Sequence, residues 1–304
     1  MEPEVHPDVT VIVPTYNDSE IHIRRALKSI LEQRLAPAEI IVVDDGSKNH
    51  TAKDAVHSLQ GLYTTKIRLY HKVNGGPSSA RNYGLRRCKT KYVSFLDSDD
   101  EMLPGDIERK VKNLQGLADD YCGVYGTFIR HPGQEPYPYG DFDGNFFSDQ
   151  IERPYGVPGV LACYLFRTQH LLSIGAFDEQ LIRYEDQDLV GRLLLSGYKI
   201  KGSIGPSYIR YYREGSLTRS GHDFEAYKDA IHFLAKAEEH QYLSKNEVGR
   251  RRKKIELNHG VALFKKGRFR QSLLHMNHAF DFAPPSTFKQ HLLWITSKVF
   301  RTII

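Results

Sequence analysis

Runs of β-branched and aromatic residues alternate with stretches of helical spacing over the first hundred residues, and this alternation constrains the fold most. The strand-like runs are residues 9–14, 40–43, 66–73 and 92–96. Helical patterns separate them near residues 20–31, 51–59 and 78–88, with Asp18 or Ser19 as the N-cap of the first. Alternating strands and helices favour a parallel sheet with right-handed crossovers. We therefore expect an α/β fold with a mainly parallel, Rossmann-like sheet flanked by helices.

Further elements are expected after residue 100. A helix is predicted near residues 103–117, a strand over 160–166, and a helix that opens in 181–189 and buries Leu189, Leu193 and Leu194. Residues 208–213 alternate as another strand. Helical periodicity then dominates, over residues 224–234, 255–264 and 272–282. We expect one α/β domain over residues 1–221 and a basic helical extension over residues 222–304.

Three carboxylates follow the strand at 92–96, namely Asp97, Asp99 and Asp100. Clustered carboxylates stay ionised most easily beside a cation. Their spacing suits Mg²⁺ or Mn²⁺, which usually takes one or two protein carboxylates together with substrate phosphate oxygens. The alternative is a polar turn, because Asp is also a common turn and N-cap residue.

Polar side chains also follow the other predicted strands. Tyr16 comes after the first strand, and the pair Asp44 and Asp45 after the second. Ligands of open α/β sheets bind along this edge, so three such placements together predict a nucleotide site. Neither a Walker A sequence nor a G-x-G-x-x-G is present.

Phosphate handling would therefore fall to a metal and to basic residues. The segment 74–82, which includes Gly76 and Arg81, combines a glycine loop with a helix N-terminus and could bind phosphate. It could equally be a plain Gly-Pro turn. Arg213 and Ser216 could grip a pyrophosphate, or they could be a solvated arginine and a turn serine.

Glu185 and Asp186 stand at the start of a predicted helix. One interpretation is compensation of the helix dipole by carboxylates in the first turn. The other is a general base, which needs an ionised carboxylate within hydrogen-bond reach of an acceptor hydroxyl. Residues 131–156, dense in Pro, Gly, Tyr and Phe, are long for a loop and favour a functional segment whose aromatics stack on sugars.

Charge is unevenly distributed along the chain. Residues 225–304 carry a net charge of +8 and the remainder −3. A basic extension suggests anionic partners, and we expect membrane headgroups or an anionic glycan rather than nucleic acid. Residues 290–304 have the pattern of an amphipathic helix that could lie on a membrane surface or pack on protein.

The same composition bears on location. The 304 residues, 40% hydrophobic and 26% charged, are typical of a globular protein, and no apolar run is long enough to span a bilayer. Three cysteines, an odd number without metal-like spacing, fit a reducing compartment. We expect a cytoplasmic protein that could be peripheral on the cytoplasmic membrane face.

Taken together, these motifs resemble family 2 glycosyltransferases of the GT-A type. The resemblance covers about residues 8–220 and does not explain the rest of the chain after residue 220. The matching segments are residues 11–17 (VIVPTYN), 42–47 (VVDDGS), 76–82 (GPSSARN), 95–100 (FLDSDD), 175–178 (GAFD) and 184–186 (YED).

The resemblance implies roles for individual residues. Pro14, Thr15, Tyr16, Asp44 and Asp45 would hold the base and ribose of a nucleotide-sugar, commonly a UDP-sugar. Asp97 and Asp99 would serve nucleotide and metal, although the metal-binding member could be Asp100. The Glu185-Asp186 pair would carry the catalytic base, which we assign to Asp186. Family members often place a metal- or phosphate-binding His near the segment that reads Arg213 to Ser216 here, where the chain instead has His222 several residues later.

The implied activity is inverting, metal-dependent transfer of a sugar to a hydroxyl of a cell-surface glycan or lipid-linked precursor. Two other functions stay open. A catalytically silent protein that binds glycan or membrane would show no metal-dependent hydrolysis of a UDP-sugar. A nucleotidyltransferase would also use a parallel sheet and an acidic metal site, but its glycine-rich, lysine-containing loop is missing after Val13.

Overall fold

The computed structural model describes residues 4–137, 143–144, 160–212, 224–241, 243–282, 284 and 290. The chain forms two compact units, Met1–Tyr212 and Arg213–Ile304. Each is described by itself below. The predicted domain boundary after residue 221 falls between 213 and 223, outside the described residues.

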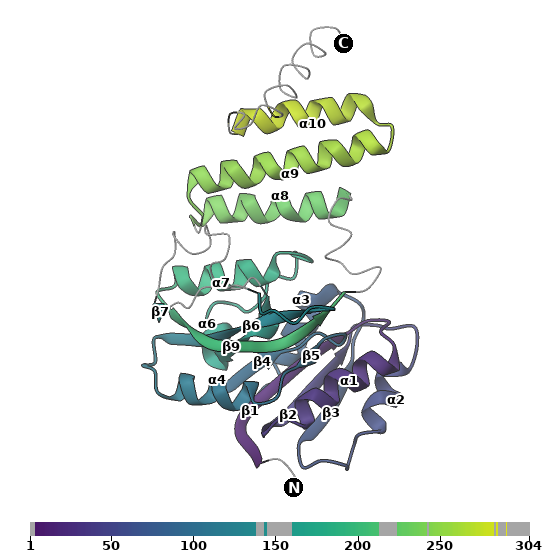
Figure 1. The fold of residues 1–304 in the computed structure, drawn as a ribbon, viewed down its shortest axis with the longest axis vertical. Coiled ribbons are helices and arrows are strands. Elements are labelled where there is room, and N and C mark those ends of the chain that lie inside the picture. The colour runs from purple at the N-terminus through teal and green to yellow at the C-terminus, as the bar shows by residue number, and fades with distance from the viewer. Residues whose placement is uncertain are drawn as a thin grey trace. The chain divides into compact units, whose positions relative to one another are not determined.

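The first unit is built on one mixed sheet (Figure 1) with the strand order β3-β2-β1-β4-β8-β6-β9-β5, and β7 pairs with β9. β3, β2, β1 and β4 are parallel neighbours, and β6 is parallel to β9. β8, β5 and β7 run antiparallel to their neighbours. The strands are β1 (Glu4–Thr15), β2 (Leu35–Asp44), β3 (Lys66–His71), β4 (Tyr92–Phe95), β5 (Glu101–Met102), β6 (Tyr121–His131), β7 (Asp143–Gly144), β8 (Tyr164–Arg167) and β9 (Lys199–Tyr211).

Helices cover both faces of this sheet. α1, α2 and α4 lie on one face, and α3 and α7 lie on the other (Figure 1). This follows from right-handed crossovers, because the chain moves outward from β1 to β3 and then returns to the other side of β1. The helices are α1 (Glu20–Leu31), α2 (Thr51–His57), α3 (Gly76–Leu85), α4 (Asp106–Gln115), α6 (Thr168–Ser173) and α7 (Glu185–Leu195). The predicted α/β architecture is confirmed.

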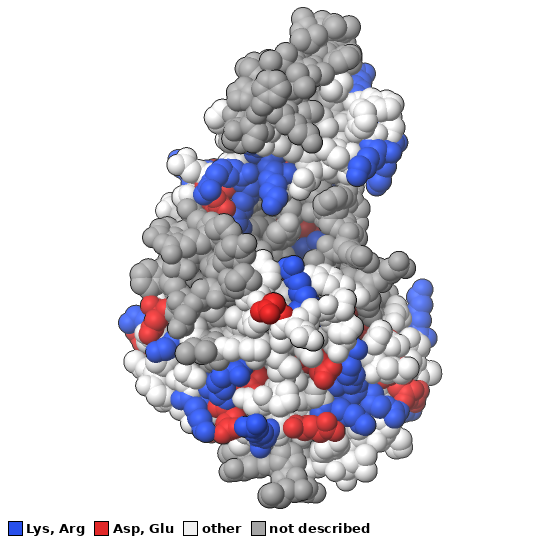
Figure 2. Space-filling view, in the orientation of Figure 1, with Lys and Arg blue, Asp and Glu red and all other residues white. Residues whose placement is uncertain are grey.

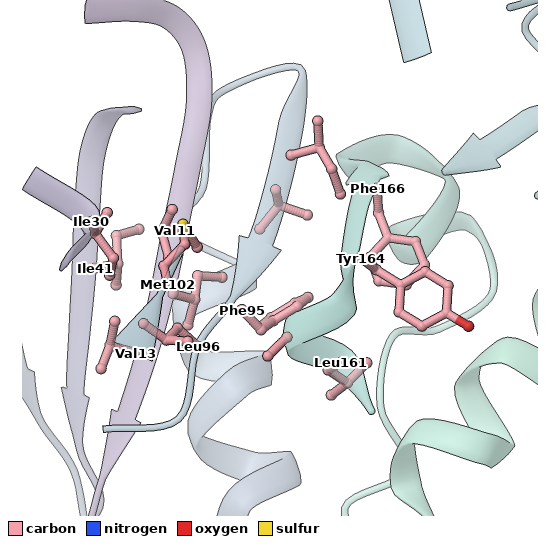
Figure 3. Close-up of a cluster of buried hydrophobic side chains, with 14 of the residues drawn as sticks. Val11, Val13, Ile30, Ile41, Phe95, Leu96, Met102, Leu161, Tyr164 and Phe166 are labelled. Atoms are coloured by element: carbon pink, nitrogen blue, oxygen red, sulfur yellow. The ribbon is translucent and has the colours of Figure 1, made fainter. Parts of the chain in front are cut away.

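The core lies between the sheet and these helices. Val11 of β1, Ile41 of β2 and Ile30 of α1 are fully buried and lie beside one another in Figure 3. Phe95 at the end of β4 and Tyr164 of β8 belong to the same buried cluster. β-branched residues on both sheet faces are typical of buried parallel strands, and burying each such side chain contributes about 1.5–3 kcal/mol.

Three differences from the sequence-based prediction have physical causes. β6 was not predicted, and β9 starts well before the expected residue 208, because neither run alternates cleanly along its length. α7 begins at Glu185 rather than near 181, because Asp178 accepts the backbone N–H of Gln180 in a local turn. Of the two predicted N-caps of α1, Asp18 and Ser19, the structure has Ser19, which accepts the N–H of His22.

The second unit contains three described helices, α8 (Phe224–Glu239), α9 (Lys245–Lys265) and α10 (Phe269–Phe282). Helices were predicted in all three regions, but α9 begins ten residues early because Ser244 caps it at the N–H of Glu247. Buried Glu256 of α9 links the helices, since it accepts hydrogen bonds from Tyr227 of α8 and His275 of α10. Apart from Gln290, the predicted amphipathic segment 290–304 lies outside the described residues.

No helix in the described part of the chain is long and apolar enough to cross a membrane.

Candidate active site

The carboxyl ends of β1, β2 and β4 bring the first polar residues together. Thr15 at the end of β1 is in register with Asp44 at the end of β2, and Ile12 with Phe95 at the end of β4. The strand order reverses between β2 and β4 around β1, and this reversal is where open α/β sheets bind ligands.

Buried Asp18 joins the loop after β1 to the acidic loop after β4. Its Oδ2 accepts hydrogen bonds from Thr15 Oγ1 at 2.9 Å, from the backbone N–H of Tyr16 at 3.1 Å and from Ser98 Oγ. This leaves the Tyr16 ring half-exposed at the sheet edge. The sequence interpretation treated Asp18 only as a candidate N-cap; an Asp three residues after a strand-end Thr was the available signal.

Asp44 and Asp45 shape the neighbouring loops. Asp44 accepts the N–H of Ser47 and lies 3.0 Å from His71 Nδ1. Asp45 accepts Lys72 Nζ at 2.6 Å and the backbone N–H groups of Gly75 and Gly76. Asp45 thereby fixes the turn that starts α3, and the expected contacts of both residues with a nucleotide stay predictions.

The turn at Gly76 requires glycine. Its φ of +87° lies in the left-handed region that L side chains rarely adopt. In this conformation its N–H points to Asp45 Oδ2 at 2.7 Å. The fixed turn sets the direction in which α3 leaves the sheet edge, and with it the position of Arg81.

Arg81 of α3 connects the two groups of acidic residues. Its Nη2 donates to Asp97 Oδ1 and its Nη1 to Glu185 Oε1, both at 2.8 Å. The Arg81 side chain is buried. Burial lowers the pKa of Arg81, but the charges of Asp97 and Glu185 outweigh it, so the pKa is raised and the guanidinium stays charged.

The three carboxylates of the acidic loop differ in environment. The Asp97 side chain is 46% exposed, and Asp99 is partly exposed. Asp100 is buried, and its Oδ1 accepts the N–H of Tyr211 at 3.0 Å. Burial first, then the charges of Asp97 and Asp99, raise the pKa of Asp100 well above its ordinary value. Asp97 and Asp99 are therefore better placed than Asp100 to contact a cation from solvent.

In the portion of the chain that the structure describes, no three His, Cys, Asp or Glu side chains are arranged to hold a metal ion. A Mg²⁺- or Mn²⁺-type site usually takes only one or two carboxylates from the protein and is completed by substrate oxygens.

Glu185 and Asp186 form the first turn of α7, directly after Tyr184, whose φ of +66° is unusual for a residue other than glycine. Burial raises the pKa of Glu185, with Arg81 acting against it. Burial and then the charge of Glu185 raise the pKa of Asp186 to about 8. A carboxylate whose pKa is moved toward neutrality is suited to exchange a proton at the pH of a cell.

Arg210 of β9 is a further residue near the acidic loop that the sequence interpretation missed. It interacts electrostatically with Asp97 and Asp100 and lowers the pKa of Asp186. The alternation of residues 208–213 was the available signal, since it puts Tyr208 and Arg210 on one side of the strand. The predicted pyrophosphate ligands Arg213 and Ser216, like His222 and most of the loop 131–156, lie outside the described residues.

The structure thus gathers Arg81, Asp97, Glu185 and Asp186, with Tyr16 and the Asp44-Asp45 pair along the same sheet edge. Its fold is the GT-A fold of glycosyltransferases. The S. aureus protein TarS (1–349), solved with UDP-GlcNAc, has a TM-score of 0.55 at 19% identity, covering 95% of this chain and 79% of that one. A mannosyltransferase from Pyrobaculum calidifontis, solved with GDP-Man and Mn²⁺, has a TM-score of 0.59 at 17% identity, covering 97% and 80%. At these identities the likeness concerns the fold.

The sequence identifies the family. The family described as Glycosyl transferase family 2 matches residues 10–172, so the chain belongs to that family. An uncharacterized glycosyltransferase of Rickettsia typhi is 34% identical over 194 residues, which are 60% of this chain and 57% of that protein. Two other Rickettsia relatives are longer still, and the chain covers 17% and 20% of their lengths. The suspected family is confirmed.

Proposed function

We propose that this family 2 glycosyltransferase is an inverting, metal-dependent hexosyltransferase. It would move a sugar from a nucleotide-sugar, most simply a UDP-sugar, to a hydroxyl of a glycan or lipid-linked acceptor. The observation that carries the proposal is the chain Asp97–Arg81–Glu185. This chain of bonds holds the acidic loop next to the carboxylates of α7. The acidic loop, which could bind a metal and a diphosphate, and Asp186, which could accept a proton, therefore belong to one site.

The donor would lie along the carboxyl edge of β1 and β2. The half-exposed Tyr16 ring can stack on a base, and the strand-end residues Pro14, Thr15 and Asp44 border the same position. The two structural neighbours were solved with nucleotide-sugars that carry different bases, UDP-GlcNAc and GDP-Man, which supports the donor class and leaves the base to experiment.

Asp97 and Asp99 would hold a divalent metal, as their exposure allows. A bound Mg²⁺ or Mn²⁺ would act as a Lewis acid that neutralises the departing nucleoside diphosphate. The presence of Mn²⁺ in the Pyrobaculum neighbour supports this cofactor. Arg81 keeps Asp97 oriented, because a guanidinium fork fixes both of its carboxylate partners.

Asp186 would accept the proton of the acceptor hydroxyl. The freed oxygen then attacks the anomeric carbon on the side opposite the diphosphate, so that one C–O bond forms as another breaks and the configuration inverts. A base with a pKa near the working pH is effective because it is both available and basic enough. Glu185 would maintain this raised pKa through its negative charge, and its bond to Arg81 favours the ionised form of Glu185.

Thermal unfolding with UDP-, GDP-, CMP- and dTDP-sugars, each with Mn²⁺ and with EDTA, tests the donor and the metal. A ligand that binds only the folded state raises the melting temperature. We expect a shift with one UDP-sugar in Mn²⁺ that EDTA abolishes. No shift with any nucleotide would overturn the proposal and favour a silent binding protein.

A matched pair of variants locates that effect. Asp99→Asn should remove the Mn²⁺-dependent part of the shift, because it removes a proposed metal ligand. Asp54→Asn, which changes an exposed carboxylate of α2, should leave the shift unchanged. An equal loss in both variants would remove the acidic loop from the metal assignment.

A further inference from the structure

Residues 264–271, from the end of α9 through the turn into α10, are exposed without interruption. Its sequence is Phe-Lys-Lys-Gly-Arg-Phe-Arg-Gln. We call residues 264–270 the hairpin tip (Figure 1). Two aromatic residues and four cations thus lie at one end of the second unit, the helical one.

The hairpin tip is a formed turn. Gly267 has a φ of +73°, its N–H donates to the carbonyl of Phe264, and the N–H of Arg268 donates to the carbonyl of Leu263. These two bonds are a Schellman motif, which ends α9 and satisfies its last carbonyls. The turn brings the Phe264 and Phe269 rings to 5.0 Å, edge to face. No ordering step is then needed before the two rings can contact a surface.

Both rings face solvent. Phe264 is 57% exposed and Phe269 is 55% exposed. Burial of a phenylalanine side chain would stabilise the fold by about 1.5–3 kcal/mol, and neither Phe264 nor Phe269 makes the full contribution because both are exposed. Single exposed apolar residues are common, but two aromatics in contact at the end of a hairpin form a small apolar surface. Such a surface gains free energy when an apolar phase covers it.

The charges around these rings have one sign. Lys265, Lys266, Arg268 and Arg270 form no ion pair with the residues that the structure describes, and the sequence has no Asp or Glu between Glu256 and Asp281. Figure 2 shows Lys and Arg side chains at this end of the helical unit with no carboxylate beside them on the visible face. Any partner that contacts the hairpin tip therefore has to carry negative charge.

We propose that the hairpin tip docks on the surface of an anionic lipid bilayer, with Phe264 and Phe269 entering the interface and the four cations contacting headgroups. A bilayer offers both an apolar layer and negative charge, which amphipathic segments with aromatic residues and Lys or Arg use together. A soluble anionic polymer would meet the cations and leave the rings in water. A second copy of the tip would bring eight cations together.

The test is sedimentation of the full chain with vesicles of phosphatidylcholine alone or mixed with phosphatidylglycerol. We expect binding to the anionic vesicles only, reduced by salt. Phe264→Ser with Phe269→Ser should weaken binding about tenfold or more, from the apolar area lost. Neutralising the four cations to Gln should weaken it further, since each contributes about fivefold near an anionic surface, or about 1 kcal/mol.

Matched controls distinguish the hairpin tip from general charge and stickiness. Leu62→Ser removes an exposed apolar side chain from the first unit, which contains the sheet. A second control changes four exposed lysines of that unit, Lys53, Lys66, Lys89 and Lys91, to Gln. Both variants should bind anionic vesicles as the unaltered chain does. Equal losses in these controls, or no binding by the unaltered chain, would overturn the proposal. So would vesicle binding that depends on the tip cations and not on the rings, which would show electrostatic adsorption without entry of the rings into the interface.

A second readout measures insertion directly. The chain has one tryptophan, Trp294, which is changed to Phe so that Phe269→Trp provides the only indole. Anionic vesicles should shift the fluorescence of this indole to the blue, and lipids brominated on the acyl chain should quench it. An indole signal that stays unshifted and unquenched while vesicles are bound would contradict the proposal. This inference is independent of the sugar that the sheet unit transfers.

Discussion

Arg81 joins the two groups of acidic residues in the candidate site. It is a buried cation held by two carboxylates almost ninety residues apart in the chain, Asp97 in the acidic loop and Glu185 in the first turn of α7. Without it, these two negative charges lack their common partner. Its role is to position the acidic loop against α7.

Arg81→Ala should lower both stability and activity. Breaking a buried ion pair by removing one partner costs about 3 kcal/mol, and loss of the preorganised site should lower kcat/KM about 100-fold or more. Arg81→Lys should be intermediate, because a single ammonium cannot replace the planar fork. Arg24→Ala, which removes a half-exposed pair with Glu20, should cost less than about 1 kcal/mol. Urea unfolding and initial rates measure these effects, and an Arg81→Ala chain that behaves like Arg24→Ala would contradict the account.

The raised pKa of Asp186 predicts how the rate of sugar transfer should depend on pH. If Asp186 is the base, as proposed, it would work only when ionised, and burial together with Glu185 raises its pKa from 3.8 to about 8. The rate should therefore rise with pH until about 8, rather than being complete above about 4. Glu185→Gln removes the neighbouring negative charge, so the apparent pKa should fall. Because the two carboxyls interact, the profile reports the pair rather than one residue.

A pH–rate profile of kcat/KM for the unaltered chain and Glu185→Gln measures this. A rate that stays constant from about pH 5 to about pH 9 would exclude an acid–base role for a group with a raised pKa.

At the scale of elements, α3 organises the site. Its first residue, Gly76, is tied to Asp45 after β2, and Ser78 donates to the carbonyl of Leu181 at 2.6 Å. Asn82 holds the loop before α7, since its amide nitrogen donates to the carbonyl of Phe177 and its amide oxygen accepts the N–H of Phe177, both at 2.9 Å. α3 therefore contacts both the loop after β2 and the segment before α7, and each of them adjoins residues of the proposed site.

Asn82→Ala should lower the free energy of unfolding by about 2–3 kcal/mol, because the N–H and carbonyl of buried Phe177 lose their partner. It should also lower activity more than substrate binding, since the loop leads to Asp186. Asn113→Ala is the matched control, because that amide bonds only one carbonyl in its own helix. Equal destabilisation by the two changes would show that Asn82 does not hold the loop. Urea unfolding and steady-state kinetics give both quantities.

At the scale of the molecule, the alternating pattern of the first hundred residues predicted the parallel core correctly. Buried strands there are continuous β-branched runs, which a sequence reveals. β6 and the first part of β9 were not predicted, because these long, irregular strands have register shifts where they pair with one another. Their pairing depends on contacts between residues about eighty positions apart, which local pattern does not contain.

The candidate site was predictable to the same extent. Strand ends located Tyr16, Asp44, Asp45, Asp97 and Asp99, because ligands bind at the carboxyl edge of such sheets. Local signals marked Asp18 and Arg210, but the groups that these residues and Asn82 contact or act on could not be predicted, because those groups lie in segments distant in sequence. The burial that separates Asp100 from Asp97 and Asp99 also needed the tertiary structure.

The most direct test of the central claim is sugar transfer by Asp186→Asn. With the donor that raises the melting temperature, transfer should fall by about 10²–10⁴-fold, the usual contribution of a general base, while donor affinity stays unchanged. Affinity is retained because the amide keeps the shape of the side chain at the start of α7. Transfer at the rate of the unaltered chain would contradict the assignment of Asp186 as the base.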